Sequence, residues 1–249
     1  MAVTGPGGAG GGGGSAIDPD LVVWYKFDES GGTIINDSAL FGGTARNGML
    51  STASTGAATF STTARVGSHA LSFTGASATA GGYASIPSLQ TIAPNALTIA
   101  CWIYVTSDQT WQRVFDLGKG ATSPLIYMFL TTHQNDSSPA SVKFAITTMG
   151  ISGEQRINMT TPAVPSLNAW HHVAVTLGAG SPYTGTLYVD RVVAGTNTAM
   201  TLHPTDLGAT DKNYIGKSQW QDPYFSGMLD DFRVYRRALT AAEIAALPP

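Results

Sequence analysis

Short apolar or alternating segments recur along the chain from Leu21 onward, and clusters of Gly, Pro, Asn and Asp separate them. In 21–27 the odd-numbered positions are apolar and share one face, whereas Trp24 and Lys26 share the other face. This period of two is that of a half-buried β-strand. The longer period of an amphipathic helix is nearly absent, so the pattern predicts an antiparallel β protein.

About a dozen segments have the length and alternation expected of strands. They are residues 21–27, 69–73, 83–86, 97–105, 113–117, 125–130, 142–147, 155–159, 171–177, 186–189, 214–216 and 227–235. Parallel pairing would require crossover helices of roughly ten or more residues, for which the sequence has no room. We therefore predict an all-β, two-sheet antiparallel sandwich, with Asp190 in a tight hairpin turn.

One short helix is predicted at the C-terminal end of the chain. Thr240 and Glu243 have the spacing of a capping box, and an Ala/Ile/Leu run follows them. The helix should span residues 240–247.

The first 16 residues are dominated by glycine between Gly5 and Ser15. Such a segment behaves as a flexible linker, which implies that another domain is attached upstream. The remainder, residues 17–249, has the size of one large β-sandwich, so we predict a single domain there.

Composition narrows the possible partners. Charged residues make up 12% of the chain, the formal net charge is −3, and no basic run is present, which argues against a nucleic-acid partner. No segment approaches the ~20 apolar residues of a membrane span. Cys101 is the single cysteine, which excludes an internal disulfide, and we expect it to be a small buried hydrophobe.

Six phrases in a fixed order resemble the laminin G-like module of the concanavalin A-like jelly-roll family, which bacteria append to glycoside hydrolases, lyases and adhesins. They lie at residues 24–38, 71–87, 97–102, 170–175, 187–190 and 225–244. The resemblance implies a jelly-roll fold and a non-catalytic, lectin-like carbohydrate-binding module of a larger secreted or cell-surface bacterial protein. Protein–protein interaction or adhesion is the alternative. Arg191 stands where the family usually has glycine, which predicts a wider hairpin turn.

Catalysis receives little support from the residue types. Retaining glycosidases need two carboxyl groups roughly 5–5.5 Å apart, and none of Glu29, Glu154 and Glu243 has a carboxylate two positions away on its strand. Asp230 and Asp231 are adjacent and should point to opposite faces of a strand. We therefore expect that the chain is not an enzyme, and glycoside hydrolase or polysaccharide lyase activity is the less favoured alternative.

The histidines and serines are the remaining candidates for a metal site or a catalytic triad. His171 and His172 are neighbours on a predicted strand, so their side chains should face opposite sides and cannot converge on one metal ion. Residue types alone leave a Ser/His/Asp triad open, but the chain has no Gly-x-Ser-x-Gly elbow.

The resemblance also implies a structural calcium ion that ties the first loop to the last strand. Asp28, Asp37 and Asp230 lie in the matching phrases and supply the hard oxygen donors that calcium prefers. The alternative is that Asp37 caps a turn while Asp230 accepts hydrogen bonds from the backbone or from arginine.

Tryptophan is the residue to follow for a glycan ligand, because aromatic rings pack on the apolar faces of sugars. Trp24, Trp102 and Trp170 fall in strand phrases and should belong to the core. Trp220 sits in a polar loop, so the first predicted ligand site comprises Gln219, Trp220, Asp222 and Tyr224. Trp111 and Arg113 form a second predicted site. The alternative for Trp220 is a plug over the end of the sandwich.

Overall fold

A computed structural model describes residues 17–51, 57–75, 80–90, 92–122, 124–135, 140–159 and 164–248. The glycine-rich segment predicted to be a linker, residues 1–16, lies outside the described residues.

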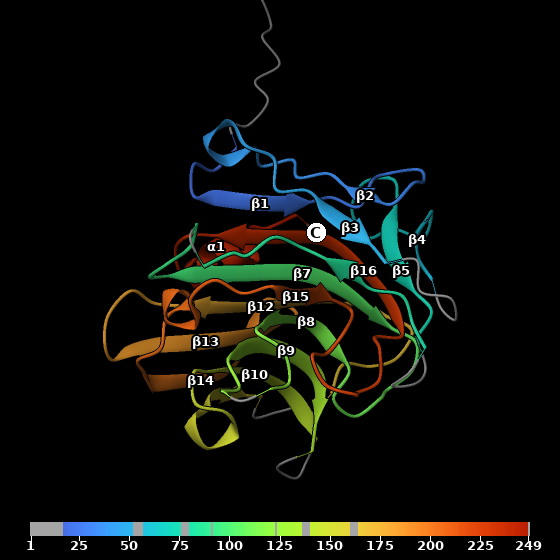
Figure 1. Ribbon diagram of the computed structural model, residues 1–249. Helices are drawn as coiled ribbons and strands as arrows, with labels where there is room; N and C mark the ends of the chain where they lie inside the picture. The colour runs from blue at the N-terminus through green and yellow to red at the C-terminus, as the bar shows by residue number, and fades with distance from the viewer. Residues whose placement is uncertain are drawn as a thin grey trace, which may run out of the picture.

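Two eight-stranded antiparallel sheets pack face to face (Figure 1), so the predicted all-β sandwich is confirmed. The first sheet has the order β14 (Val192–Met200), β13 (Tyr183–Val189), β12 (Trp170–Leu177), β7 (Leu97–Val105), β16 (Gly227–Tyr235), β5 (Ala70–Phe73) and β4 (Ala58–Ser61), and β1 (Leu21–Tyr25) also pairs with β16. The second has the order β11 (Gln155–Asn158), β10 (Ser141–Thr147), β9 (Tyr127–Gln134), β8 (Arg113–Gly118), β15 (Lys212–Ile215), β6 (Ala84–Ser85), β3 (Gly48–Leu50) and β2 (Ile34–Ile35).

The hydrophobic core lies between these two sheets. Alternate residues of each strand point into this core. Met128 and Leu130 of β9 and Phe144 of β10 are examples, and they are essentially unexposed. Cys101 of β7 is also buried in this core, as expected, and burial raises the pKa of its thiol. The predicted bounds of β7 and β16 are confirmed, whereas the list of predicted strands lacked the short strands β2, β3 and β4 and the nine-residue strand β14.

A β-bulge in β16 corrects the prediction for the two adjacent aspartates. The register shifts between Asp230 and Arg233, and Asp231 has a φ of 51°. Because Leu229 and Phe232 both lie in the core, Asp230 and Asp231 between them both face away from it. Alternation predicted opposite faces, and the extra residue of the bulge is the reason that this was wrong.

The hairpin between β13 and β14 is tighter than predicted. Val189 pairs with Val192, which leaves a two-residue turn, and Asp190 and Arg191 both have positive φ, 50° and 67°. Hydrogen bonds from the Arg191 guanidinium to the carbonyl oxygens of Leu247 and Pro248 compensate for the strain of this conformation in a residue with a Cβ. Arg191 therefore does not widen the turn.

The outer face of the first sheet is covered by the C-terminal helix α1 (Ala241–Ala245). The predicted capping box is confirmed: the Glu243 amide donates to Thr240 Oγ1 at 3.3 Å, and the Thr240 amide donates to Glu243 Oε2 at 2.8 Å. Ile244 packs against an apolar cluster outside the sheet. No described helix is long and apolar enough to cross a membrane.

The two ends of the described chain meet on this side of the molecule. The Arg236 guanidinium lies 2.8 Å from an Asp20 carboxylate oxygen, and the Arg237 guanidinium lies 2.7 Å from one of Asp18. These pairs fasten the residues before β1 to those after β16, so both ends sit beside the first sheet.

Two carboxylates, the buried one of Asp230 and the half-buried one of Asp28, hold one loop against the first sheet. Asp230 Oδ2 accepts hydrogen bonds from the backbone amides of Arg65 and Val66 at 2.7 and 2.8 Å. Asp28 Oδ1 accepts from the amides of Ser68 and His69 at 2.5 and 3.2 Å. Four of the five backbone amides of residues 65–69, all except that of Gly67, thus donate to side chains from distant parts of the chain.

Asp230 should make stability depend on pH. Burial raises the pKa of its carboxyl to about 6, above the ~3.9 of an unfolded chain. Between about pH 4 and pH 6 the native state thus binds this proton more tightly than the unfolded state. The contribution of the protonated carboxyl to the free energy of unfolding is complete below pH 4 and is lost as the pH rises through 6. Asp230→Asn removes this titration. The free energy of unfolding of the variant minus that of the original protein should therefore increase by about 1–3 kcal/mol when the pH rises from 4 to 7.

Urea denaturation at both pH values measures this change. Asp211→Asn is the control, because the Asp211 side chain is 72% exposed. The same stability difference for Asp230→Asn at both pH values would contradict the assignment.

Candidate functional site

The outer face of the second sheet carries charged and aromatic side chains instead of a helix. Strand alternation sends Arg113 of β8, Tyr127 and Phe129 of β9 and Lys143 of β10 out of the core. All four are nevertheless buried, with exposed fractions between 1% and 3%. Other parts of the chain must therefore cover this face.

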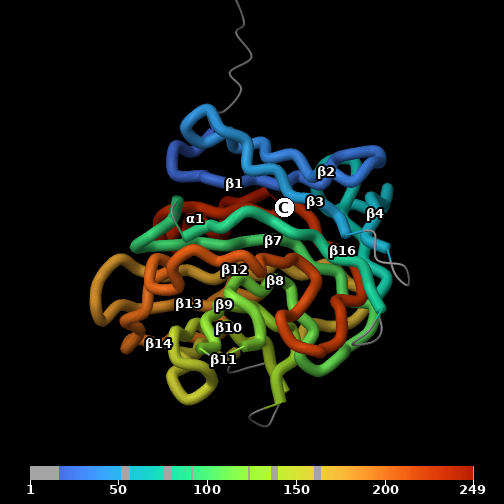
Figure 2. Tube along the Cα trace, in the orientation of Figure 1, coloured from blue at the N-terminus to red at the C-terminus, as the bar shows by residue number. Residues whose placement is uncertain are grey.

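Two half-buried tryptophans provide much of that cover. Trp111 directly precedes β8, has a φ of 66°, and is held by its amide, which donates to the His133 carbonyl at 2.7 Å. Trp220 lies in the loop between β15 and β16, which passes beside β8 and β9 (Figure 2). Its ring meets that of Tyr127 edge to face, with 4.9 Å between centroids.

A cavity of about 350 Å³ opens between the two tryptophans, and we call it the aromatic cavity. Aromatic, cationic and anionic side chains line it together: Trp111, Arg113, Tyr127, Phe129, Lys143, Ile151, Glu154, Arg156, Trp220 and Asp222. Its volume and its mixture of rings with a few polar groups are typical of small-ligand sites.

Cations and aromatic rings alternate in this cavity. The Arg113 guanidinium carbon lies 4.0 Å from the Phe129 ring centroid and 5.4 Å from that of Trp111. Lys143 Nζ lies 5.3 Å from the Trp111 centroid and 5.6 Å from that of Phe129. These cation–π contacts fix the positions of the rings and of the charged groups before any ligand arrives.

Glu154 balances the charge on one side of the cavity. Its Oε2 lies 2.9 Å from Lys143 Nζ and 2.7 Å from Arg156 Nε, and its Oε1 accepts a hydrogen bond from the Tyr127 hydroxyl at 2.5 Å. Burial raises the pKa of the Tyr127 hydroxyl, so it stays a donor at neutral pH. Both oxygens of this carboxylate thus have partners, which allows it to be buried, and Oε1 retains room to accept a further hydrogen bond.

Arg113 organises the other side. Its guanidinium lies 3.1 Å from Asp222 Oδ2 and 3.4 Å from Asp116 Oδ2. Burial raises the pKa of the Asp116 carboxyl to about 6, and the nearby Arg113 charge acts against that rise. The Gln219 amide side chain also donates to Asp116, which ties the Trp220 loop to β8.

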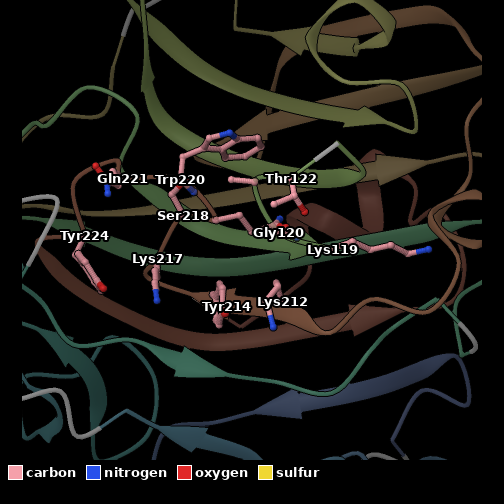
Figure 3. A pocket seen from close by; sticks show the side chains of 12 residues that line it. Lys119, Gly120, Thr122, Lys212, Tyr214, Lys217, Ser218, Trp220, Gln221 and Tyr224 are labelled. Carbon is pink, nitrogen blue, oxygen red and sulfur yellow. Dashed lines mark hydrogen bonds between the residues drawn. The ribbon is translucent and has the colours of Figure 1, made fainter. Parts of the chain in front are cut away.

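A second cavity has a volume of about 730 Å³ (Figure 3), and we call it the lysine cavity. Trp220 lines both cavities. Gln219, Tyr214 and Tyr224 line the lysine cavity together with Lys119, Lys212 and Lys217.

The structure brings the two predicted ligand sites into one region. Trp111, Arg113, Trp220 and Asp222 share the aromatic cavity, whereas Gln219 and Tyr224 lie in the lysine cavity. Their role in binding stays a prediction.

Sequence reasoning missed six residues of the aromatic cavity that come from β9 to β11 and the turn before β11. They are Tyr127, Phe129, Lys143, Ile151, Glu154 and Arg156. The available signal was a lysine within the otherwise apolar run 142–146, which marks a face that does not point into the core.

The tryptophans expected in the core lie outside it. Trp102 is 7% exposed but packs on the outer face of the first sheet, where the Arg65 guanidinium stands 4.4 Å from its ring. Trp24 and Trp170 are half-buried, and Trp24 Nε1 donates to Asp231 at 2.7 Å. All three lie on the side of the first sheet that faces away from the second sheet. The predicted burial is confirmed for Trp102, whereas Trp24 and Trp170 are only half-buried.

His171 and His172 face opposite sides of β12, as predicted. His172 packs edge to face on Trp102, and burial lowers its pKa to about 4. His171 joins Ser166 and Asp190: its Nε2 lies 2.8 Å from Ser166 Oγ, and its Nδ1 lies 2.8 Å from Asp190 Oδ2. This connectivity is that of a Ser-His-Asp triad.

The carboxylates expected to bind calcium accept hydrogen bonds from backbone amides. Asp37 caps a turn, receiving the amides of Trp24, Ala39 and Arg46 at 2.9 to 3.0 Å. Asp28 and Asp230 hold the loop 65–69. In the described part of the chain no three His, Cys, Asp or Glu side chains are grouped to hold a metal, so one ion bound by all three aspartates does not fit. Calcium itself stays a prediction.

A family model matches residues 77–245, and it describes the concanavalin A-like lectin/glucanases superfamily. The chain belongs to this superfamily. The match spans β6 through α1 and therefore includes both cavities, and it agrees with the resemblance found in the sequence. No curated protein sequence matches the chain.

Solved structures with this fold include several carbohydrate-binding domains. Domain 4 of AbnA, a GH43 extracellular arabinanase from Geobacillus stearothermophilus solved with arabinotriose, has a TM-score of 0.69 at 19% identity, over 92% of this chain and 98% of that one. The CBM40 of the Ruminococcus gnavus IT-sialidase, bound to α2,3 sialyllactose, has a TM-score of 0.51 at 16% identity, over 61% and 82%.

The binding domain of botulinum neurotoxin DC, solved in complex with SialylT, is similar over 93% of this chain and 51% of that one. Its TM-score is 0.61 at 13% identity. These likenesses show the fold.

Metal removal tests the calcium prediction. An ion bound to the native state alone stabilises it by mass action, so EDTA should lower the melting temperature by several degrees and calcium should restore it. Differential scanning fluorimetry measures both steps, with magnesium as the control addition. A melting temperature unchanged after complete metal removal would contradict a structural calcium ion.

Proposed function

We propose that this chain is a non-catalytic carbohydrate-binding module, and that a sugar residue occupies the aromatic cavity between Trp111 and Trp220. The observation that carries the proposal is the alternation of rings and paired charges around that cavity. A sugar has apolar faces and a rim of hydroxyl groups, so its recognition requires aromatic surfaces and fixed hydrogen-bonding groups in one place.

The paired charges favour recognition over catalysis. Glu154 and Asp222 are already engaged by Lys143, Arg156 and Arg113, so each carboxylate can accept a sugar hydroxyl while its own position stays fixed. Groups that are held in place before binding lose little conformational entropy when the ligand arrives.

The solved relatives support the same class of ligand. The three domains were solved with arabinotriose, sialyllactose and SialylT as the bound molecules. We extend the class, a glycan, to this chain, and propose that the module belongs to a larger secreted or cell-surface bacterial protein.

A protein partner is the second candidate. Ile151 lines the aromatic cavity with 64% of its surface exposed, and Met149, two residues earlier in the chain, is 76% exposed. Exposed apolar groups beside a cavity are also typical of protein–protein contacts. Binding to a glycan array distinguishes the two candidates, because adhesion to a protein alone gives no signal there.

Trp220→Ala should abolish glycan binding while the fold persists. Loss of a central aromatic contact typically costs about 2 kcal/mol or more, which corresponds to roughly thirtyfold in affinity. A glycan array followed by calorimetry on each hit measures the loss, and the melting temperature should fall by no more than a few degrees because the ring is half-buried.

Trp170→Ala is the matched control. Trp170 is also half-buried and also contacts a tyrosine edge-on, Tyr104 at 5.5 Å, but it lies on the first sheet. Equal affinities for Trp220→Ala and the original protein would remove the aromatic cavity from consideration.

The Ser166 group provides the test of the non-catalytic proposal. The Asp190 carboxylate is 53% exposed and also accepts the His172 amide at 3.1 Å, so water screens its effect on His171. We therefore expect no nucleophilic serine: a fluorophosphonate probe should leave Ser166 unmodified by mass spectrometry. Labelling that disappears in His171→Ala would contradict a non-catalytic module.

A further inference from the structure

The lysine cavity concentrates positive charge beside the proposed sugar site. Lys119, Lys212 and Lys217 line it, which are three of the five lysines in the chain. Among the described residues, no aspartate or glutamate lines this cavity. Within the described residues, the ion pair that these lysines make is that of Lys212 with Asp211 at 3.3 Å, and both of those side chains are well exposed. An exposed pair of this kind neutralises little charge.

Lys217 is held in place by rings and not by a carboxylate. Its Nζ lies 4.2 Å from the ring centroid of Tyr83, 4.8 Å from that of Tyr214 and 5.7 Å from that of Tyr224. Tyr83 and Tyr214 themselves pack edge to face at 5.3 Å. Cation–π contacts fix an ammonium group without cancelling its charge. Lys217 is therefore a positioned cation for which the described residues supply no anion.

Hydrogen-bond donors and acceptors surround this cation. Burial raises the pKa of the Tyr214 hydroxyl, so this group remains protonated and can donate. The side chains of Thr122 and Gln221 also line the cavity (Figure 3) and offer groups for sugar hydroxyls. The cavity thus has what an anionic sugar requires, namely a fixed cation and polar groups around it.

The two cavities share one wall. Trp220 lines both. The side chain of Gln219 beside it donates to Asp116, the partner of Arg113, and accepts from the Gly120 amide of the lysine cavity. A chain of two or more sugars could therefore pass Trp220 and place neighbouring residues in the two cavities.

We infer that the lysine cavity is an anion-binding subsite that takes a carboxylate- or sulfate-bearing sugar of the oligosaccharide whose neighbouring residue occupies the aromatic cavity. This inference rests on the proposed carbohydrate-binding function and specifies its ligand class. The volume of about 730 Å³ lies within the range of small-ligand sites.

Matched pairs of oligosaccharides test the inference. Lactose is compared with 3′-sialyllactose and with a sulfated lactose, and methyl-esterified oligogalacturonate is compared with the free acid. Calorimetry at about 50 mM salt should show the anionic member binding about tenfold or more tightly, and the advantage should shrink at about 500 mM salt because ions screen the attraction. The carboxylate and sulfate arms identify which anion is preferred.

Lys217→Gln should remove most of that advantage and leave the affinity for the neutral member within about twofold. Lys212→Gln provides a second variant in case the tyrosine cluster around Lys217 loses its packing. Lys26→Gln is the matched control: Lys26 also stands over a ring, 4.3 Å from the Trp24 centroid, but on the first sheet. It removes the same charge and the same type of contact away from both cavities.

The outcomes separate the two proposals. Neutral and anionic members that bind equally, with Trp220-dependent binding intact, overturn the anionic subsite and leave the carbohydrate-binding function standing. An anionic preference that survives both Lys217→Gln and Lys212→Gln, or that falls equally in Lys26→Gln, also overturns the subsite. Absence of any glycan binding overturns both proposals.

Discussion

The burial of charge on the outer face of the second sheet is the constraint on which the candidate site depends. A β-strand that packs one face against a core must send every second side chain the other way. In β8 and β10 those side chains include Arg113 and Lys143, which can be buried because Asp222 and Glu154 pair with them. The tryptophan rings can cover these groups because the pairs are already satisfied.

Different kinds of element cover the outer faces of the two sheets. On the first sheet, α1 supplies Ile244 to an apolar cluster that covers the strands. On the second sheet, loops supply Trp111 and Trp220, which leave cavities between and beside them. A helix packs continuously along a sheet, whereas two separated rings do not. The hollow face and the covered face thus follow from which elements lie on them.

Much of the fold could be predicted from the sequence, because long strands such as β7 and β16 have continuous patterns. The short strands β2, β3 and β4 were missed, since two to four residues give too little periodicity. The strand β14 was missed although it has nine residues, because its burial does not alternate and most of its side chains are exposed or half-buried. The error at Asp231 came from a bulge, which inserts one residue into a regular alternation and has no signature in the pattern. Arg191 misled for a related reason: its distant partners at Leu247 and Pro248 hold a turn that local propensity disfavours.

The candidate site was predictable in part. Trp111 and Trp220 were found because each lies in a polar segment, but their convergence depends on the packing of two loops that are distant in sequence. The sequence could not place Glu154 beside these tryptophans, since its position in the cavity depends on its ion pair with Lys143, which lies on the neighbouring strand β10. The tryptophans expected in the core were misplaced because both faces of the first sheet are covered, so burial alone does not identify the core side.

The ion pairs between Asp18, Asp20, Arg236 and Arg237 fix the direction in which the polypeptide leaves the sandwich. Both ends of the described chain lie by the first sheet, whereas the two cavities open on the opposite side of the molecule. The same ion pairs thus keep the first and last described residues off the face that carries Trp111 and Trp220, so a long glycan lying across that face would meet loops of the second sheet and neither end of the sandwich.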